Sequence, residues 1–178
     1  MTDLTGRHAL VTGGGTGIGL AIATSLADAG AEVTITGRRA DVLEAAAAAH
    51  DRLHAATMDV TNEDDIRSAI AAARAARGPV TICVANAGIA EGRKLSKTST
   101  ELWRKVMAVN LDGVFLTVRE CLPDMEEGDW GRVIAISSIA GVKGLKGAGA
   151  YSASKPGVIG LIRSLSEDYL GSGLTFNA

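Results

Sequence analysis

Five glycines within eight residues near the N-terminus constrain the fold of this chain more than any other feature. The segment reads Thr12-Gly13-Gly14-Gly15-Thr16-Gly17-Ile18-Gly19, and it joins an apolar run to a helical pattern. Glycine lets a backbone turn tightly and approach a ligand closely, and the free amides at a helix start attract anions. The segment therefore predicts a phosphate-binding turn between a first strand and a first helix. The alternative is a flexible loop without a ligand.

Short apolar runs alternate along the chain with segments whose apolar residues recur at helical spacing, as in 18–29 and 66–73. The predicted strands are 9–11, 33–36, 80–84 and 133–136, with weaker candidates at 53–58 and 174–176. Runs this apolar are typical of strands buried on both faces, and strands that alternate with helices form parallel sheets. The sequence predicts an α/β fold, a doubly wound, Rossmann-like parallel sheet with helices on both faces. We expect residues 1–178 to form a single domain.

Helix boundaries are predicted from capping patterns. Thr61 precedes Asp64 by three residues, and Thr98 precedes Glu101 by three, which is the spacing of a reciprocal N-terminal cap. Two glycines that follow helical segments predict helix ends: Gly30 and Gly78.

Composition excludes several classes of protein. The 18 basic and 20 acidic residues give a net charge of −2 and form no runs, so the chain lacks the charge pattern of a nucleic-acid or membrane-surface protein. No apolar stretch approaches the roughly 18 residues of a membrane helix, and the N-terminus does not resemble a secretory signal. We therefore expect a cytoplasmic protein.

The cysteines and histidines do not predict a metal site or a disulfide. Cys83 and Cys121 lie far apart in apolar runs, so buried thiols are expected. His50 and His54 are four residues apart but lack the acid of an H-E-x-x-H motif, which favours a surface location.

Further motifs follow the predicted strands in order. They are Asp59-Val60, Asn86-Ala87-Gly88, Asn110 within V-N-L, Ser138, and Tyr151-Ser152-Ala153-Ser154-Lys155. The interval from Ser138 to Tyr151 is 151 − 138 = 13 residues. Together with T-G-x-x-x-G-I-G, these motifs resemble the short-chain dehydrogenase/reductase family in its standard form, and the resemblance extends over the whole chain.

The resemblance implies an oxidoreductase that transfers a hydride between a nicotinamide cofactor and a ketone or secondary alcohol. Tyr151 would be the acid/base, Ser138 would position the carbonyl oxygen, and Lys155 would assist Tyr151 and hold the ribose. Asn110 would hold a water in a proton relay, the alternative being a helix-kinking or capping amide. The implied cofactor-binding residues, besides Tyr151 and Lys155, are Gly13, Gly15, Thr16, Gly17, Ile18, Gly19, Asp59, Val60, Asn86, Ala87 and Gly88.

The spacing of Tyr151 and Lys155 supports these roles independently. Residues four apart lie on one face of a helix. A free tyrosine has a pKa of about 10, and a nearby ammonium favours the tyrosinate. Pro156 follows Lys155 directly and allows a local kink there, because proline lacks an amide hydrogen.

The choice of cofactor is predicted from Gly37-Arg38-Arg39, which stands where an acidic residue would bind the ribose of NAD. A guanidinium suits a 2′-phosphate, so NADP(H) is predicted, with Arg38 the main contact and Arg39 beside it. NAD remains the alternative, because Asp41 lies close by.

Substrate and assembly are less constrained. The leading substrate classes are 3-oxoacyl thioesters and sugar or polyol alcohols, and Lys143 and Lys146 could meet an anionic carrier or simply face solvent. The resemblance implies a homodimer or homotetramer through helices near 111–122 and 152–170. It also implies chain beyond residue 178, so we expect the C-terminal part to be missing; the alternative function is a nucleotide-binding protein without catalysis.

Overall fold

The apolar runs form the strands of one parallel sheet in the computed structural model, which describes residues 3–178. The strands are β1 (His8–Thr12), β2 (Glu32–Gly37), β3 (Leu53–Thr57), β4 (Ile82–Ala85), β5 (Gly131–Ala135) and β6 (Leu174–Asn177). Their order across the sheet is β3-β2-β1-β4-β5-β6, the arrangement of a doubly wound dinucleotide-binding fold. The predicted fold class is confirmed.

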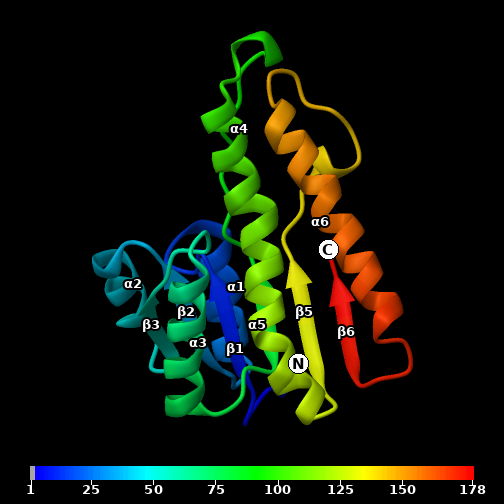
Figure 1. Ribbon diagram of the computed structural model, residues 1–178. Coiled ribbons are helices and arrows are strands. Elements are labelled where there is room, and N and C mark those ends of the chain that lie inside the picture. Colours follow the sequence, from blue (N-terminus) through cyan, green and yellow to red (C-terminus); the bar gives the residue numbers. More distant parts are fainter. Residues whose placement is uncertain (1–2) are drawn as a thin grey trace.

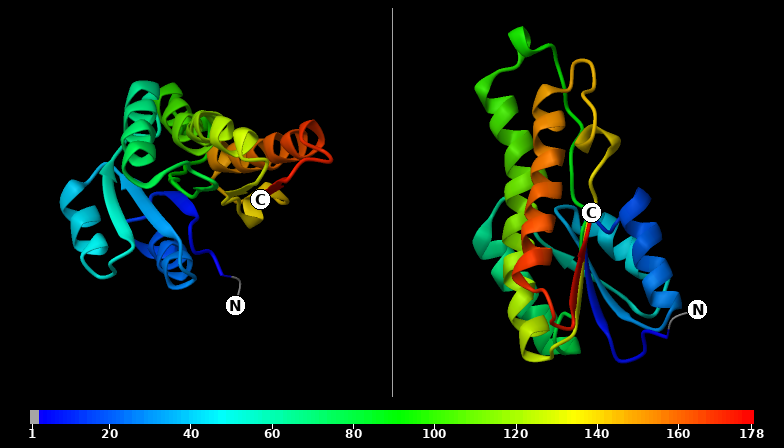
Figure 2. Two further views of the ribbon diagram at one scale, coloured as in Figure 1. Left: turned by 90° about the horizontal axis from the view of Figure 1, so that it is seen from below. Right: turned by 90° about the vertical axis from the view of Figure 1, so that its right-hand side faces the viewer.

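Helices cover both faces of this sheet (Figures 1 and 2). They are α1 (Gly17–Asp28), α2 (Ala40–Ala47), α3 (Glu63–Arg77), α4 (Thr100–Met107), α5 (Gly113–Glu127) and α6 (Gly149–Asp168). In the right-hand view of Figure 2, α1 and α2 lie on one side of the sheet, and α3, α5 and α6 lie on the other. The upper part of α6 and the whole of α4 extend beyond the strand ends (Figure 1).

The sheet is buried on both faces at its centre because β1 is apolar throughout its middle. Ala9, Leu10 and Val11 are each 0% exposed. Leu10 packs in a core with residues of α3, α5 and α6, whereas Ala9 and Val11 pack in a second core with residues of α1 and α2. Burial of one such Leu or Val side chain contributes about 1.5–3 kcal/mol. The two cores hold β1, and hence the glycine-rich segment that follows it, in place.

The direction of winding reverses between β1 and β4. The chain passes from β1 to β2 on one side, while β4 pairs with β1 on the other. In open α/β sheets, ligands bind outside the carboxyl ends of the strands at such a point. The segments after β1 and β4 therefore form the expected position of a binding site.

Two predicted helix caps are wrong by one residue. Asn62 caps α3, because its side chain accepts hydrogen bonds from two amides in the first turn of that helix. Ser99 caps α4 by accepting from the amide three residues further on. The threonine hydroxyls are engaged elsewhere, since Thr61 donates to the Asp59 carboxylate and Thr98 donates to the carbonyl oxygen four residues before it.

The two predicted helix ends are confirmed. Gly30 and Gly78 follow α1 and α3 with positive φ angles of 101° and 81°, which glycine adopts without strain. Pro156 lies inside α6, which continues through it from Gly149 to Asp168. None of the helices within residues 3–178 combines the length and apolar character needed to cross a membrane.

Candidate active site

The glycine-rich segment forms a tight turn in which side chains have no room. Gly13 and Gly17 have positive φ angles of 64° and 55°. A Cβ atom added at Gly19 would overlap the Gly13 carbonyl oxygen and lie 2.5 Å from Asn86 Nδ2. The first turn of α1 contains no acidic residue, so its free amides face the cavity without a competing anion.

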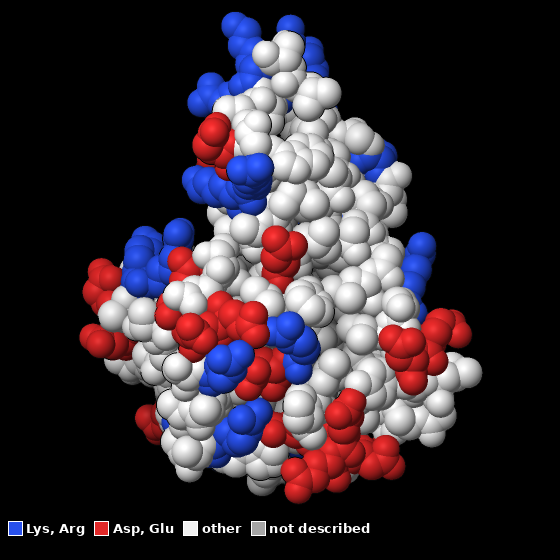
Figure 3. Space-filling model, viewed as in Figure 1, with Lys and Arg blue, Asp and Glu red and all other residues white. Residues whose placement is uncertain are grey.

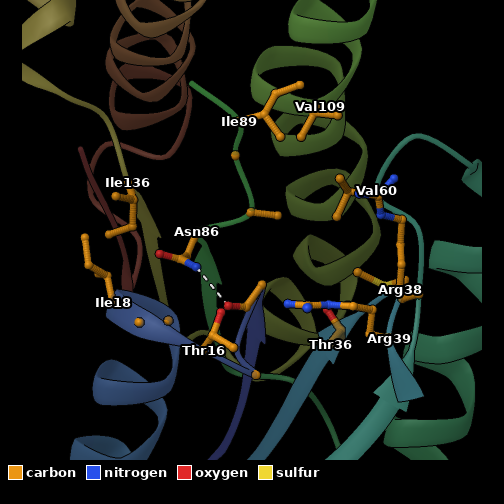
Figure 4. Close-up of a pocket in the computed structure, with 18 of the residues that line it drawn as sticks. Thr16, Ile18, Thr36, Arg38, Arg39, Val60, Asn86, Ile89, Val109 and Ile136 are labelled. Atoms are coloured by element: carbon orange, nitrogen blue, oxygen red, sulfur yellow. Dashed lines mark hydrogen bonds between the residues drawn. The ribbon is translucent and has the colours of Figure 1, made fainter. Parts of the chain in front are cut away.

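Thr12 and Asn86 fasten the turn to the segment after β4. The Thr12 hydroxyl oxygen accepts hydrogen bonds from the amides of Asn86 (3.0 Å) and Ala87 (2.9 Å). Asn86 Nδ2 in turn donates to the carbonyl oxygens of Thr12 (2.8 Å) and Gly13 (3.3 Å). The Asn86 side chain points toward the turn in Figure 4. These bonds fix two neighbouring loops at the carboxyl ends of β1 and β4.

A cavity of about 780 Å³ opens beside these loops. Its volume lies within the range typical of cofactor and ligand sites. Of the predicted site residues, those that line it are Gly13, Gly15, Thr16, Gly17, Ile18, Gly19, Arg38, Arg39, Asp59, Val60, Asn86, Ala87, Gly88, Tyr151 and Lys155. Arg38 and Arg39 lie at one end of the view in Figure 4, and Ile89 and Val109 lie at another. Asn110 and Ser138 do not line the cavity.

The end of the cavity near β2 carries two cations and one anion. Arg38 and Arg39 follow β2, and both line the cavity. The Asp59 carboxylate accepts hydrogen bonds from the Thr61 amide (2.9 Å) and hydroxyl (2.8 Å). The backbone bond from Thr61 is the main cause that lowers the pKa of Asp59, and the charge of Arg38 adds to it. Asp41 lies in the first turn of α2, outside the cavity lining.

Tyr151 and Lys155 lie one turn apart on α6, and both line the cavity. Lys155 is only 4% exposed, and its Nζ lies 5.7 Å from the centroid of the Tyr151 ring. Nζ donates a hydrogen bond to the Ile136 carbonyl oxygen (2.7 Å) at the end of β5. Burial lowers the pKa of Lys155, because desolvation disfavours the charged form. A desolvated cation thus lies against the phenol ring.

Asn110 lies behind the cavity wall in a π-helical turn, Ala108–Asp112, between α4 and α5. It is 0% exposed. Its Oδ1 accepts from the Ile89 amide (2.8 Å), and its Nδ2 donates to the Ile89 carbonyl (2.9 Å) and to Ser154 Oγ (3.3 Å). A Cβ at Gly88 would lie 3.4 Å from Asn110 Oδ1 and 3.7 Å from Lys155 Nζ, so the two groups flank Gly88.

Ser138 precedes a short 3-10 helix, Ile139–Gly141, and caps it by accepting a hydrogen bond from the Ala140 amide (3.1 Å). The neighbouring Ser137 lines the cavity, and its hydroxyl donates to the Lys155 carbonyl oxygen (3.3 Å). The structure therefore places Ser138 beside the cavity rim, with its oxygen engaged by the backbone.

Several residues that build the site were not predicted. Thr12, Ile136 and Ser154 orient Asn86, Lys155 and Asn110, respectively, through hydrogen bonds. Thr12 and Ser154 carry a sequence signal, because Thr12 opens the glycine-rich segment and Ser154 belongs to the motif that runs from Tyr151 to Lys155, whereas Ile136 carries none. Within residues 3–178, no group of three His, Cys, Asp or Glu side chains is placed so that it could hold a metal ion.

Comparison with known proteins places this arrangement in a family. The model of the short chain dehydrogenase family matches residues 7–178. The chain is 44% identical to an NADP-dependent (R)-specific alcohol dehydrogenase of Lentilactobacillus kefiri, covering 94% of this chain and 67% of that protein. It is 36% identical to a 2-dehydro-3-deoxy-L-rhamnonate dehydrogenase (NAD(+)) of Sphingomonas sp., covering 97% and 70%.

A third relative is the 3-oxoacyl-[acyl-carrier-protein] reductase MabA of Mycobacterium tuberculosis, 36% identical over 96% of this chain and 66% of that protein. Among solved structures, actinorhodin polyketide ketoreductase with NADPH superposes with a TM-score of 0.95 at 34% identity, covering 100% of this chain and 70% of that one. The relatives are dehydrogenases and reductases that act on CH–OH groups or the corresponding carbonyls. The chain belongs to the short-chain dehydrogenase family of oxidoreductases.

Proposed function

We propose that this protein transfers a hydride between NADP(H) and a ketone or secondary alcohol, with Tyr151 as the acid/base. The observation that carries this proposal is the buried Lys155 ammonium, 5.7 Å from the Tyr151 ring, in the same cavity as the glycine-rich turn. A packing role for Tyr151 would not require a desolvated cation beside it.

The residues at the other end of the cavity fit a dinucleotide. A pyrophosphate would meet the free amides of α1, and the glycines leave space for its close approach. Asp59 and Val60 would contact the adenine, and Asn86, Ala87 and Gly88 would line the path toward the nicotinamide. When bound, the nicotinamide supplies or accepts the hydride at the carbon of the substrate.

NADP(H) is proposed because Arg38 and Arg39 line the cavity where the 2′-phosphate of the adenosine ribose would lie. One named relative and one solved structure are described with NADP or NADPH. NAD is the second candidate, because another relative is named as NAD-dependent. Asp41, the acid that would favour NAD, lies outside the lining.

The side chains of the protein would transfer one proton to or from the substrate oxygen. During reduction, the Tyr151 hydroxyl donates its proton to the carbonyl oxygen; during oxidation, the phenolate takes the proton from the alcohol. Lys155 stabilises negative charge on the phenol oxygen, because opposite charges attract strongly where water is excluded. Ser138 Oγ accepts from the Ala140 amide, so its hydroxyl hydrogen would be available to donate to the substrate oxygen, and Asn110 would hold a water behind Lys155.

The substitution Tyr151→Phe tests the acid/base role. We expect turnover with NADPH to fall by at least about a thousandfold, since general acid catalysis contributes about 10²–10⁴-fold and the phenol also orients the substrate. NADPH affinity should stay within about threefold, because the ring remains. A panel of ketones, sugars and 3-oxoacyl thioesters supplies the substrates.

Tyr169→Phe is the matched control, because the Tyr169 hydroxyl bonds to Glu126, away from the cavity. Its turnover should equal that of the unaltered protein. Retained turnover in Tyr151→Phe would remove Tyr151 from the acid role. Tight NADPH binding without turnover on any substrate would favour a catalytically silent protein. The cytoplasmic location and the homo-oligomer remain predictions, the latter testable by light scattering.

A further inference from the structure

The surface above the cavity is unusually cationic. It is formed by residues 91–97, between β4 and α4, and residues 139–148, between β5 and α6. Figure 3 shows blue side chains gathered at the top of the molecule, with few red ones among them. The basic residues of these two loops, all of them exposed, are Arg93, Lys94, Lys97, Lys143 and Lys146.

This positive charge is not neutralised within residues 3–178. None of the five side chains forms an ion pair with another described residue. Segment 139–148 contains no acidic residue. Glu91, the acid of the first loop, is already paired with Lys105 Nζ at 2.5 Å. The whole protein has a net charge of −2, so the excess of positive charge in these two loops differs from the charge balance of the rest of the chain.

The backbones of the two loops touch at Gly92 and Gly147, and each of these glycines is next to a basic residue in the sequence. A Cβ at Gly92 would overlap the Gly147 carbonyl oxygen, and a Cβ at Gly147 would lie 4.0 Å from the carbonyl carbon of Arg93. Arg93 of one loop is therefore close to the backbone that follows Lys146 in the other. Like charges repel when they converge, and an anion bound between them relieves the repulsion.

This meeting point lies beside the catalytic pair. The Leu145 amide donates to Ser152 Oγ (3.3 Å), which ties the second loop to the residue after Tyr151. The first loop follows Ala90, which lines the cavity together with Ile89 and Val109. The cavity wall near Tyr151 is therefore apolar, and the cations of the two loops lie outside the lining.

We propose that the substrate is an anionic ketone or alcohol, in which an apolar chain separates the reacting carbon from a carboxylate, phosphate or sulfonate group. Arg93, Lys143 and Lys146 bind that group at the cavity rim. The proposal rests on the proposed oxidoreductase function and specifies its substrate class. A small substrate is favoured over an acidic protein partner because Arg93 and Lys146 stand next to the point where the two loops touch, and both loops adjoin residues of the cavity.

Methyl ketones that end in a carboxylate, and their methyl esters, test this proposal over a series of chain lengths. With NADPH as cofactor, kcat/KM for the acid should exceed that for the ester, with a maximum at one length. The triple variant Arg93→Gln/Lys143→Gln/Lys146→Gln should lower kcat/KM for the acid about tenfold and leave the ester within about twofold. High salt should lower the acid preference in the same way, because it screens exposed charges.

Arg163→Gln is the control, because it removes one exposed cation of α6 outside the two loops. It should leave the acid preference unchanged. Equal kcat/KM for acid and ester at every length would overturn the proposal. A second result would also overturn it. If polyglutamate inhibits the protein but not the triple variant, and the protein does not prefer acids over esters, the cations bind an acidic protein partner.

Calorimetry keeps the two proposals distinguishable. If the esters react and kcat/KM for the acids is no higher than for the esters, the proposed oxidoreductase function stands and the proposed anionic substrate class is rejected. If neither series reacts, each acid and ester is titrated into the NADPH complex, and the two affinities show whether the rim binds the anionic group. Tighter binding of the acid, lost in the triple variant, supports the cationic rim, and equal binding rejects it.

Discussion

The two ends of the cavity are built from different parts of the chain. At the nucleotide end, the turn after β1 consists of glycines and backbone amides, and Thr12 and Asn86 hold it by four hydrogen bonds to the backbone. At the catalytic end, long side chains converge, with Lys155 reaching from α6 to the Ile136 carbonyl. The nucleotide end therefore depends on the absence of side chains, whereas the catalytic end depends on their chemistry.

Gly19→Ala should produce the largest effect at the nucleotide end. The added Cβ would overlap the Gly13 carbonyl and lie 2.5 Å from Asn86 Nδ2, and both groups are held by other bonds. We expect a destabilisation of about 1–3 kcal/mol and at least a hundredfold loss of NADPH affinity, because the turn must move. Chemical denaturation and NADPH fluorescence titration measure the two effects.

Gly160→Ala is the matched control, because no atom lies within 4 Å of a Cβ added there. It replaces a glycine inside α6, so it should stabilise the protein by about 0.5–1 kcal/mol. If Gly19→Ala behaved like Gly160→Ala, the nucleotide end would not depend on a closely packed glycine.

Asn110→Ala should reveal how the catalytic end is supported. The substitution leaves the amide and carbonyl of Ile89 without their side-chain partner, and a buried unpaired polar group costs about 1–3 kcal/mol. Urea unfolding should show a loss in that range. Asn110→Asp keeps the acceptor for the Ile89 amide but buries a carboxylate and places its second oxygen against the Ile89 carbonyl, so at neutral pH its stability should fall at least as far. Unchanged stability in Asn110→Ala would show that Ile89 finds other partners.

Arg38→Asp should change the cofactor preference without a comparable change in the fold. A charged hydrogen bond to a phosphate is worth about 1.5–3 kcal/mol, so the ratio of kcat/KM for NADPH over NADH should fall about 10- to 100-fold. Arg39→Gln should change it less, if Arg38 is the main contact. An unaltered ratio in Arg38→Asp would contradict the assignment of the 2′-phosphate site.

The nucleotide end could be predicted from sequence because its signal is local. The glycines lie within one continuous segment, residues 13–19, and the place of this segment between a strand and a helix determines where the backbone turns. The catalytic end was predicted in part, since the spacing of Tyr151 and Lys155 follows from one helix. The Ile89 partner of Asn110 is 21 residues away and depends on a π-helical turn that no periodicity indicates.

Competition between nearby hydroxyls and amides explains the misplaced caps. Thr61 and Thr98 have the expected spacing, but each hydroxyl donates to an oxygen of a residue that precedes it in the chain, and the next residue caps the helix. The engaged state of Ser138 has a similar origin, because its oxygen accepts from the amide two residues on. Such local bonds depend on backbone conformation, which residue type alone does not determine.

Strand β1 also carries a titratable group, at the end opposite the glycine-rich turn. His8 is 2% exposed; its Nδ1 lies 2.9 Å from the Gly78 carbonyl and its Nε2 lies 2.9 Å from Thr34 Oγ1. Arg77 Nε donates to that same oxygen. The Gly78 carbonyl oxygen accepts from Nδ1, so in the neutral imidazole Nε2 accepts from the Thr34 hydroxyl.

Burial is the main cause that lowers the pKa of His8 below 6.5; the charges of Arg77 and His54 act in the same direction, and the Gly78 carbonyl and Asp124 oppose them. The unfolded chain therefore binds a proton more readily than the folded one. The stability that neutral His8 contributes is complete above pH 6.5 and is lost as the pH falls toward the folded pKa. We therefore expect the free energy of unfolding to be lower at about pH 5 than at pH 7.5.

Urea unfolding at the two pH values measures this loss, and His8→Asn should reduce the pH dependence. The NADPH-to-NADH ratio should not change in His8→Asn, because His8 lies outside the cavity lining. A shifted ratio would show that the two ends of β1 are coupled, so that the nucleotide end is not determined by its glycines alone. An NMR titration in which the His8 imidazole becomes protonated above pH 6.5 would contradict a pKa lowered by burial, because a raised pKa would make the folded protein gain stability as the pH falls.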